Sequence, residues 1–337
     1  MNCTLLIPDL FPPHTAPHGL HLPALDALLA RGDSQAEPEG GMESWLCRAF
    51  GADKQADWPA APFSLLADGG VPGCDYWLRV DPVSVQLMRN QLVLFADDSI
   101  APSEVEAAEL CAALNRHFSA ENLHFSAPHP RRWYLRLPQA PNLLTFPLAQ
   151  VNGRDIRHFL PDGADSADFR KLLNEAQMLL HAHPLNAARE TAGLPPINSI
   201  WPWGGGVLPE SIARPYAQVF ADDALARGLA LHAGAACHAL PPDADACLRA
   251  GNGDLLVVLD ALRGATPQGL PARQTQLARL EANWFAPLKL ALRRGNIRRL
   301  TLIAPGAASI ALSRLDLLLP AWIGKLWRRF TTLSARS

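Results

Sequence analysis

The chain has 337 residues, of which 49% are hydrophobic and 18% are charged, and its formal net charge is −2. This length and composition are typical of a globular protein with a sizeable core, and they argue against wholesale disorder. The near-balanced charge argues against a nucleic-acid partner, because proteins that dock on nucleic acids usually carry a basic excess.

Hydrophobic periodicity predicts alternating helices and strands along the chain. Buried-type strands are expected near both ends, and such strands favour a doubly wound α/β core sheet. Residues 73–162 lack this alternation of helices and buried strands and predict an inserted α+β domain. Residues 1–72 and 163–337 then form one discontinuous core domain. The main expected strands lie at 4–10, 75–98, 133–137, 217–220, 255–260 and 299–304, and the main helices at 23–32, from 44, and at 103–118, 166–183, 222–234 and 274–295.

The sequence gives no sign of export or membrane insertion. The first fourteen residues lack a basic region and are interrupted by Pro8 and Asp9, so they predict a first strand rather than a signal peptide. No run approaches the roughly 18 apolar residues of a transmembrane segment. Six cysteines are scattered without CxxC spacing, which is typical of a reducing compartment. A cytoplasmic protein is expected.

The segment His183–Gly206, with the sequence HPLNAARETAGLPPINSIWPWGGG, concentrates groups that suit a binding site. Asn186 and Arg189 are three residues apart and share a helical face, from which an arginine can hold a phosphate or carboxylate. The three glycines can bring backbone N–H groups to an anion. The alternative is structural: Asn186 and Arg189 brace local turns, while Trp201 and Trp203 fill the core.

Two residues near the N-terminus have equally divided interpretations. Ser44 is either the N-cap of a helix or a nucleophile at a helix N-terminus. Asp9 is either a loop cap or a metal ligand. The histidines His14, His18 and His21 lack acidic or cysteine neighbours and are interpreted as solvated loop residues. His181 and His183 are two apart on a helix, which is poor spacing for one metal.

Several blocks together resemble two related protein families. The stretches LLIPDL, LPALDALLARG, YWLRVDPVSVQ and HPLNAARETAGLPPINSIWPWGGG resemble blocks of the archaeal-type cofactor-independent phosphoglycerate mutases of the alkaline-phosphatase superfamily. The stretches ESWLCRAFG, DYWLRVDPV, HPRRWYLRL and INSIWPWGGG resemble the RpfE-type regulatory protein family of proteobacteria. The resemblance implies an alkaline-phosphatase-like core with a smaller inserted domain.

The resemblance also implies a site that this chain lacks in part. In the active mutases two divalent metals, held by Asp and His, activate a serine. Asp9 stands where the first-strand ligand is expected, and Ser44 where the nucleophile is expected. The loop ALRGATPQG at 261–269 has no Asp or His, and Pro305, Gly306 and Ala307 stand where an Asp-His pair is expected. Such side chains cannot coordinate a cation, so two metals are expected to be lost and no cofactor is predicted.

Three functions compete on these observations. The first is a catalytically inactive, mutase-like regulatory protein that binds a small phosphorylated or carboxylate ligand, or a regulatory protein partner, in a cleft. The second is a metal-dependent phosphotransferase or phosphatase that uses Ser44, Asp9 and an acid such as Asp254 or Asp260. The third is a protein-interaction scaffold whose apolar-then-basic segment Leu315–Phe330 docks a partner or a membrane surface. The predicted cleft residues are Arg79, Arg132 (with Arg131 as a contributor), His183, Asn186, Arg189, Asn198, Trp203, Gly204, Gly205 and Gly206.

Overall fold

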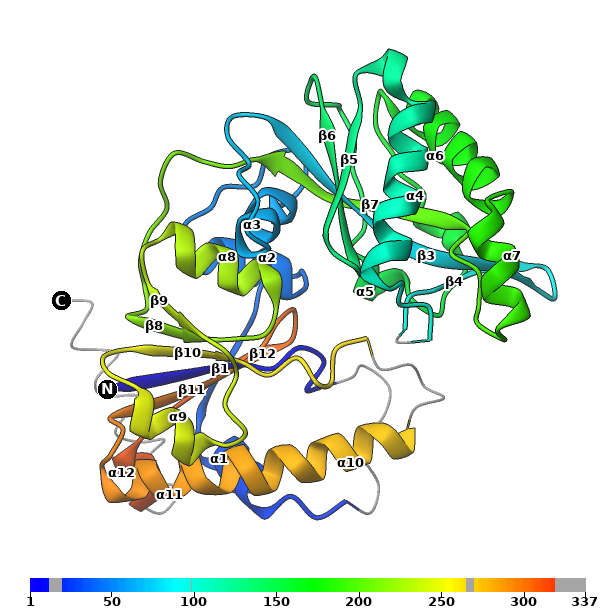
Figure 1. Cartoon of the computed structure of the whole chain (residues 1–337). Coiled ribbons are helices and arrows are strands. Elements are labelled where there is room, and N and C mark those ends of the chain that lie inside the picture. Colours follow the sequence, from blue (N-terminus) through cyan, green and yellow to red (C-terminus); the bar gives the residue numbers. More distant parts are fainter. Residues whose placement is uncertain (12–19, 98, 265–269, 319–337) are drawn as a thin grey trace. The chain divides into compact units, whose positions relative to one another are not determined.

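The computed structural model describes residues 1–11, 20–97, 99–264 and 270–318 (Figure 1). The chain folds into two compact units. The first comprises residues 1–45, 214–230 and 234–337, and the second comprises residues 46–213 and 231–233. Helices α2 (Met42–Ala49) and α8 (Ala224–His232) each begin in the first unit and end in the second.

The described residues of the first unit form a seven-stranded sheet in the order β2-β12-β11-β1-β10-β8-β9. Strands β11, β1, β10, β8 and the edge strand β9 are parallel to one another, whereas β12 and β2 continue the sheet in antiparallel pairing. The central strand β10 is the short apolar run LLVV and is fully buried, as expected of a strand covered on both faces. The strand bounds are β1 (Asn2–Leu6), β2 (Asp33–Ala36), β8 (Gln218–Phe220), β9 (Ala236–His238), β10 (Leu255–Val258), β11 (Arg299–Ala304) and β12 (Ala308–Ser313).

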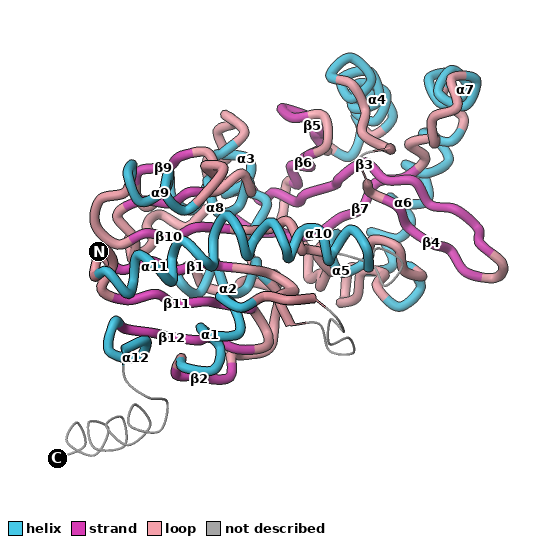
Figure 2. The backbone as a smooth tube through the Cα atoms, turned by 90° about the horizontal axis from the view of Figure 1, so that it is seen from below, coloured by secondary structure: helices cyan, strands magenta, loops and turns pink. Residues whose placement is uncertain are grey.

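One face of this sheet is covered by α1, α10 and α11, which are seen in front of the strands in Figure 2. The single long helix predicted at 274–295 is divided by a π-helical turn at Glu281–Phe285. Pro287 follows this turn and has no backbone N–H to donate, so the regular α-helical ladder cannot run through it. Glu281 accepts hydrogen bonds from the backbone N–H groups of Ala24 and Leu25, and so caps α1. The helices are α1 (Pro23–Arg31), α9 (Ala244–Ala250), α10 (Leu270–Leu280), α11 (Ala286–Arg294) and α12 (Arg314–Leu318).

The second unit is built on an antiparallel sheet in the order β4-β3-β6-β5, with β7 paired to β3. Helices α4 and α6 pack on it around a core that contains Leu110, Trp133 and Leu180. The strands are β3 (Tyr76–Met88), β4 (Gln91–Phe95), β5 (His124–His129), β6 (Arg132–Leu137) and β7 (Ser199–Val207). The helices are α3 (Ala60–Ala67), α4 (Glu104–His117), η1 (Ser119–Glu121), α5 (Leu148–Val151), η2 (Ile156–His158), α6 (Ser166–His181) and α7 (Pro184–Thr191).

The predicted α/β fold class is confirmed, but the division of the chain differs from the prediction. The second unit is wider than the expected insertion at 73–162, because residues 46–72 and 163–213 also belong to it. Strand β7 pairs with β3 from Ser199 to Val207, and α6 packs against β7. Periodicity cannot reveal such a pairing between strands about 120 residues apart.

Some predicted features lie outside the described residues. These are His14 and His18, part of the loop 261–269, and most of the segment Leu315–Phe330, whose residues up to Leu318 belong to α12. Within the described part of the chain, no helix is long and apolar enough to cross a membrane.

The three consecutive glycines lie in β7, where they allow close packing. Gly204 has a φ of 67°, and a Cβ there would lie 2.9 Å from the Cβ of Ala60 in α3. A Cβ on Gly205 would lie 2.3 Å from the Tyr76 hydroxyl, and one on Gly206 would lie 2.5 Å from Pro59. The glycines therefore let β7 approach its neighbours more closely than any other residue type would allow.

Gly205→Ala is expected to lower the free energy of unfolding by about 1–3 kcal/mol, because the added methyl group meets Tyr76 and Leu78. Chemical denaturation measures this change. Gly193→Ala is the control: Gly193 has a φ of 74° with nothing within 4 Å, so it should cost only about 1 kcal/mol of backbone strain. A Gly205→Ala protein as stable as the wild type would contradict the close-packing explanation.

Candidate functional site

The candidate site of the first unit lies at the carboxyl edge of its parallel strands. Asp9 follows β1, Asp223 follows β8 and Asp260 follows β10. Because these three strands are parallel and adjacent, their carboxyl ends meet at one edge of the sheet, where α/β proteins usually place their ligands. The fold therefore gathers acidic residues that are far apart in the sequence.

The side chain of Arg263 lies among these acids. Its Nη2 donates to Oε1 of Glu43, and its Nη1 lies 3.3 Å from Oδ2 of Asp223. The side chain is only 20% exposed. Burial alone would lower the pKa of Arg263, but the charges of Glu43 and Asp223, together with those of Asp260 and Asp9, raise it. We call Arg263 and these four acids the carboxylate–arginine cluster.

One further contact fixes the geometry of this cluster. Asp9 has a left-handed backbone with a φ of 57°, and its Oδ2 accepts a hydrogen bond of 2.8 Å from the backbone N–H of Gly264. The bond ties the loop after β1 to the loop that carries Arg263. Burial raises the pKa of Asp260, and the nearby charge of Asp223 adds to this effect, while Arg263 opposes it. The acids therefore repel one another, and the guanidinium compensates that repulsion.

Ser44 lies beside Glu43 in the first turn of α2. The helix begins at Met42, so Ser44 is inside it, and of its two interpretations the N-cap one was wrong. The side chain is buried, and its hydroxyl donates a 2.9 Å hydrogen bond to the carbonyl of Gly41. The helix starts earlier than expected because Gly40 and Gly41 supply the turn before it. In this arrangement the Ser44 hydroxyl proton is directed at a backbone acceptor.

The loop after β11 has no side chain that can bind a cation. Pro305, Gly306 and Ala307 carry no donor side chain. Gly306 has a φ of 72°, and a Cβ there would lie 2.6 Å from the carbonyl oxygen of Gly40. The backbone before α2 therefore occupies the space into which a ligating side chain at position 306 would extend.

The residues present do not fit the two divalent metals that the resemblance implies. Within the described ranges, no three His, Cys, Asp or Glu side chains converge as metal ligands. Two of the acids at the carboxyl edge, Glu43 and Asp223, are instead paired with the fixed cation Arg263. A divalent ion and a guanidinium cannot share the same carboxylates without strong repulsion.

In the second unit, two of the predicted cleft arginines belong to a buried ionic network. Arg79 donates from Nε and Nη2 to Asp81 at 2.9 and 2.8 Å, and its guanidinium stacks on Trp203 at 4.9 Å. Trp203 donates its indole N–H to the same carboxylate at 2.8 Å. Burial raises the pKa of Asp81, against the opposing effect of Arg79 and Trp203.

The second arginine of this network, Arg132, contacts Asp68 at 2.8 and 2.6 Å, and Tyr134 donates to the same carboxylate at 2.6 Å. Burial would raise the pKa of Asp68, but these hydrogen bonds and the arginine charges outweigh it and lower the pKa. The two halves of the network adjoin, since Arg79 also lies 5.4 Å from the ring of Tyr134.

The polar groups of the His183–Gly206 segment are occupied by the protein itself. Asn186 bonds the carbonyls of Leu180 and Ile197 and accepts from the Ile197 N–H, at 2.7 to 2.9 Å. Arg189 is 3% exposed and donates to Glu106 and to the carbonyls of Pro195 and Ile100.

Two further predicted residues of the segment, Asn198 and His183, also form hydrogen bonds within the protein. Asn198 exchanges two hydrogen bonds with the backbone of Val85, and His183 caps α7 by accepting from the Leu185 N–H. These are the contacts of the structural alternative, in which the segment braces turns.

Sequence reasoning missed the residue that organises the first unit. Arg263 follows a buried strand, and although Asp260 lies three residues before it, its ion-pair partners Glu43 and Asp223 are far away in the chain. Asp222 and Asp223 after the strand at 217–220 are a signal that was available, because paired acids at the end of a parallel strand indicate a site. Asp68 and Asp81, the partners of the predicted arginines, were also missed.

Comparison with known proteins places the chain near the mutases. It is 33% identical over 205 residues to the 2,3-bisphosphoglycerate-independent phosphoglycerate mutase of Methanosarcina mazei. The aligned region covers 57% of this chain and 50% of that protein. The protein of the same name from Methanosarcina acetivorans is 29% identical over 205 residues, and this aligned region covers 56% of this chain and 49% of that protein. The chain thus spans about half the length of the curated relatives it matches. No protein-family model matches the chain.

A solved structure supports the fold. The PH0037 protein from Pyrococcus horikoshii superposes with a TM-score of 0.55 over 92% of this chain and 86% of that chain, at 14% identity. The chain is therefore similar in sequence to cofactor-independent phosphoglycerate mutases, and its core sheet is of the alkaline-phosphatase-like type expected from the sequence.

Arg189→Ala is expected to lower the free energy of unfolding by about 3 kcal/mol, because it leaves the carbonyls of Pro195 and Ile100 and the carboxylate of Glu106 without a partner. Urea denaturation measures this loss. Arg116→Ala, on the exposed surface of α4, is the control and should change stability by less than about 0.5 kcal/mol. Unchanged stability together with lost phosphate binding would instead assign Arg189 to an anion site.

Proposed function

We propose that this chain is a catalytically inactive, phosphoglycerate-mutase-like protein of the RpfE-type regulatory family, which acts in the cytoplasm by binding a ligand or a protein partner. The single observation that supports the loss of catalysis is the position of Arg263. Its guanidinium lies among carboxylates at the carboxyl edge of β1, β8 and β10, the edge at which the resemblance to the mutases places the metal-ligand position Asp9.

The chemistry at this edge supports the proposal in two ways. A guanidinium cannot polarise water or a phosphate ester as a divalent ion does, since it has no open coordination position. A serine hydroxyl is a weak nucleophile without a base or a metal, and the Ser44 hydroxyl donates its proton to Gly41. A phosphoryl-transfer step therefore has neither a Lewis acid to polarise the phosphoryl group nor an activated nucleophile.

The regulatory role rests on the sequence resemblance to the RpfE-type family and on the retention of both units. We do not propose the His183–Gly206 segment as the anion site, because Asn186, Arg189 and Asn198 each have partners in the protein. We propose instead that the ligand or partner binds at a solvent-accessible surface outside the His183–Gly206 segment.

The proposal predicts a protein without stoichiometric divalent metal and without mutase or phosphatase turnover. Elemental analysis of the purified chain should find no bound metal. With phosphoglycerate and added Mn²⁺, the wild type should react no faster than Ser44→Ala, and Ser34→Ala on the exposed strand β2 is the matched control. Bound metal together with metal-dependent turnover that Ser44→Ala abolishes would establish the phosphotransferase instead.

Arg263→Ala is expected to destabilise the chain by about 3–5 kcal/mol in metal-free buffer, because Glu43 and Asp223 lose their counter-charge. Millimolar Mg²⁺ or Mn²⁺ should raise the melting temperature of this variant, since a divalent cation can then approach the carboxylates, but should leave the wild type unchanged. Arg299→Ala, at the exposed start of β11, is the control. A variant indifferent to metal would show that the guanidinium does not stand in for a cation.

A further inference from the structure

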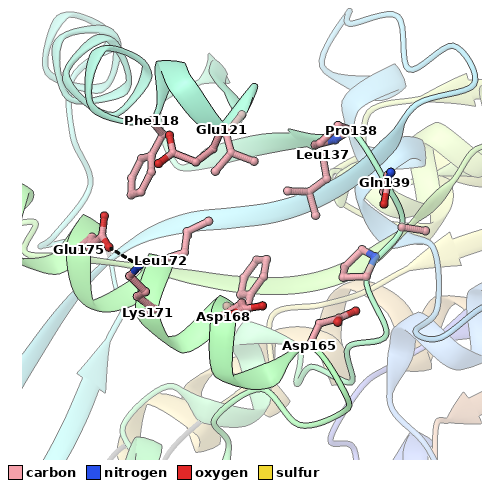
Figure 3. A pocket seen from close by; sticks show the side chains of 14 residues that line it. Phe118, Glu121, Leu137, Pro138, Gln139, Asp165, Asp168, Lys171, Leu172 and Glu175 are labelled. Carbon is pink, nitrogen blue, oxygen red and sulfur yellow. Dashed lines mark ion pairs between the residues drawn. The ribbon is translucent and has the colours of Figure 1, made fainter.

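The second unit contains a groove whose lining includes none of the residues of the Arg79–Arg132 ionic network. It has a volume of about 580 Å³ and runs between the C-terminal end of α4 with η1 on one side and α6 on the other (Figure 3). The loop that follows β6, from Pro138 to Pro141, closes one end. This volume is within the range of sites that bury a ligand of drug size or a few side chains of a peptide.

The interior of the groove is apolar. Phe118 and Leu137 line it from the α4 and β6 sides, and Phe169 and Leu172 line it from α6. Phe118 and Phe169 belong to the core of the unit, so the groove has a firm base, whereas Leu172 is half-buried and faces the open space. An apolar surface of this kind gains free energy when a second apolar group covers it.

The rim of the groove carries an excess of negative charge. Four carboxylates, those of Glu121, Asp165, Asp168 and Glu175, face one ammonium group, that of Lys171, which leaves three uncompensated negative charges. Lys171 lies 3.9 Å from Glu175 and is therefore already paired. Within the described residues, Glu121 and Asp168 form no salt bridge, so their charges are available to a ligand.

The acids of α6 have an additional structural reason to be there. Asp165 accepts a hydrogen bond from the N–H of Asn142, and Asp168 lies in the first turn of α6, where the helix dipole favours a negative charge. Glu121 belongs to η1, and Glu175, farther along α6, is paired with Lys171 and, at 3.3 Å, with His117; both line the same groove. The negative potential is therefore a property of the groove as a whole.

The groove is elongated rather than round. Its lining along α6 runs from Asp165 through Asp168, Phe169 and Leu172 to Glu175, a single face spaced by three or four residues. Ten residues of helix rise about 15 Å, which matches about ten residues of a second helix and exceeds the length of a small metabolite.

We propose that this groove binds a cationic amphipathic peptide segment of a partner protein, which places apolar side chains against Phe169 and Leu172 and lysine or arginine side chains against Glu121 and Asp168. Helices that lay an apolar face into such a groove are a recurrent mode of peptide recognition, and opposite charges at the rim select the partner. The proposal does not depend on whether the first unit is catalytic. An anionic segment is disfavoured by the rim charge.

Fluorescence anisotropy on the full chain tests this with three labelled twelve-residue helical peptides that share one leucine face. Their polar faces carry Lys and Arg, Gln, or Glu. The cationic peptide is expected to bind roughly tenfold more tightly than the glutamine peptide, and the glutamate peptide to bind more weakly still. Hydrogen exchange should show protection at residues 118–123, 137–141 and 165–175 when the cationic peptide is bound.

Variants separate the charge from the fold. The double variant Glu121→Gln with Asp168→Asn should weaken cationic binding about fivefold, and Leu172→Gln should weaken binding of all three peptides. Glu190→Gln, an exposed acid of the same unit outside the groove, should leave affinity unchanged. Thermal melting confirms that each variant is folded.

The proposal would be overturned by no binding at millimolar peptide, by equal affinity for the cationic and glutamate peptides, or by full affinity in the folded double variant. Equal affinity for n-octylammonium and the cationic peptide would also overturn it, because the groove would then belong to a small amphipathic cation.

Discussion

Carboxylates that meet at one edge of a sheet repel one another, and the first unit depends on the guanidinium that offsets this repulsion. Parallel pairing of β1, β10 and β8 brings Asp9, Asp260 and Asp223 to the same edge of the sheet. In metalloenzymes, bound metal ions neutralise such clustered carboxylates. Here Arg263 resolves it from within the chain, and the same contacts join the loop after β10 to α2 through Glu43.

The second unit uses the same physical device for a different purpose. Arg79 and Arg132 are each paired with a carboxylate, and Trp203 and Tyr134 add hydrogen bonds to those carboxylates. Such a network is costly to break because a lone buried charge is left behind. It holds β3, β6 and β7 to the end of α3. The tryptophan- and arginine-rich blocks of the sequence are therefore explained here by packing.

In both clusters, arginine side chains neutralise carboxylates that the fold brings together. The loop 305–307 offers no side-chain ligand, and the backbone at Gly40 fills the space beside Gly306. Restoring a metal site would therefore require moving backbone as well as replacing side chains. In contrast, the groove along α6 is open and carries charges without partners, and it gives the second unit a binding surface that no phosphate chemistry requires.

The sequence by itself determined the alternation of helices and strands, the α/β class and the absence of donor side chains at positions 305–307, because these follow from local periodicity and residue type. It also raised the structural alternative for Asn186 and Arg189. Only the tertiary structure decided that Arg189 pairs with Glu106, 83 residues away, that Arg263 lies among acids from three separate strands, and that residues 163–213 belong to the second unit. The physical reason is that such contacts arise from strand pairing and burial across long sequence separations, for which local sequence carries no signal.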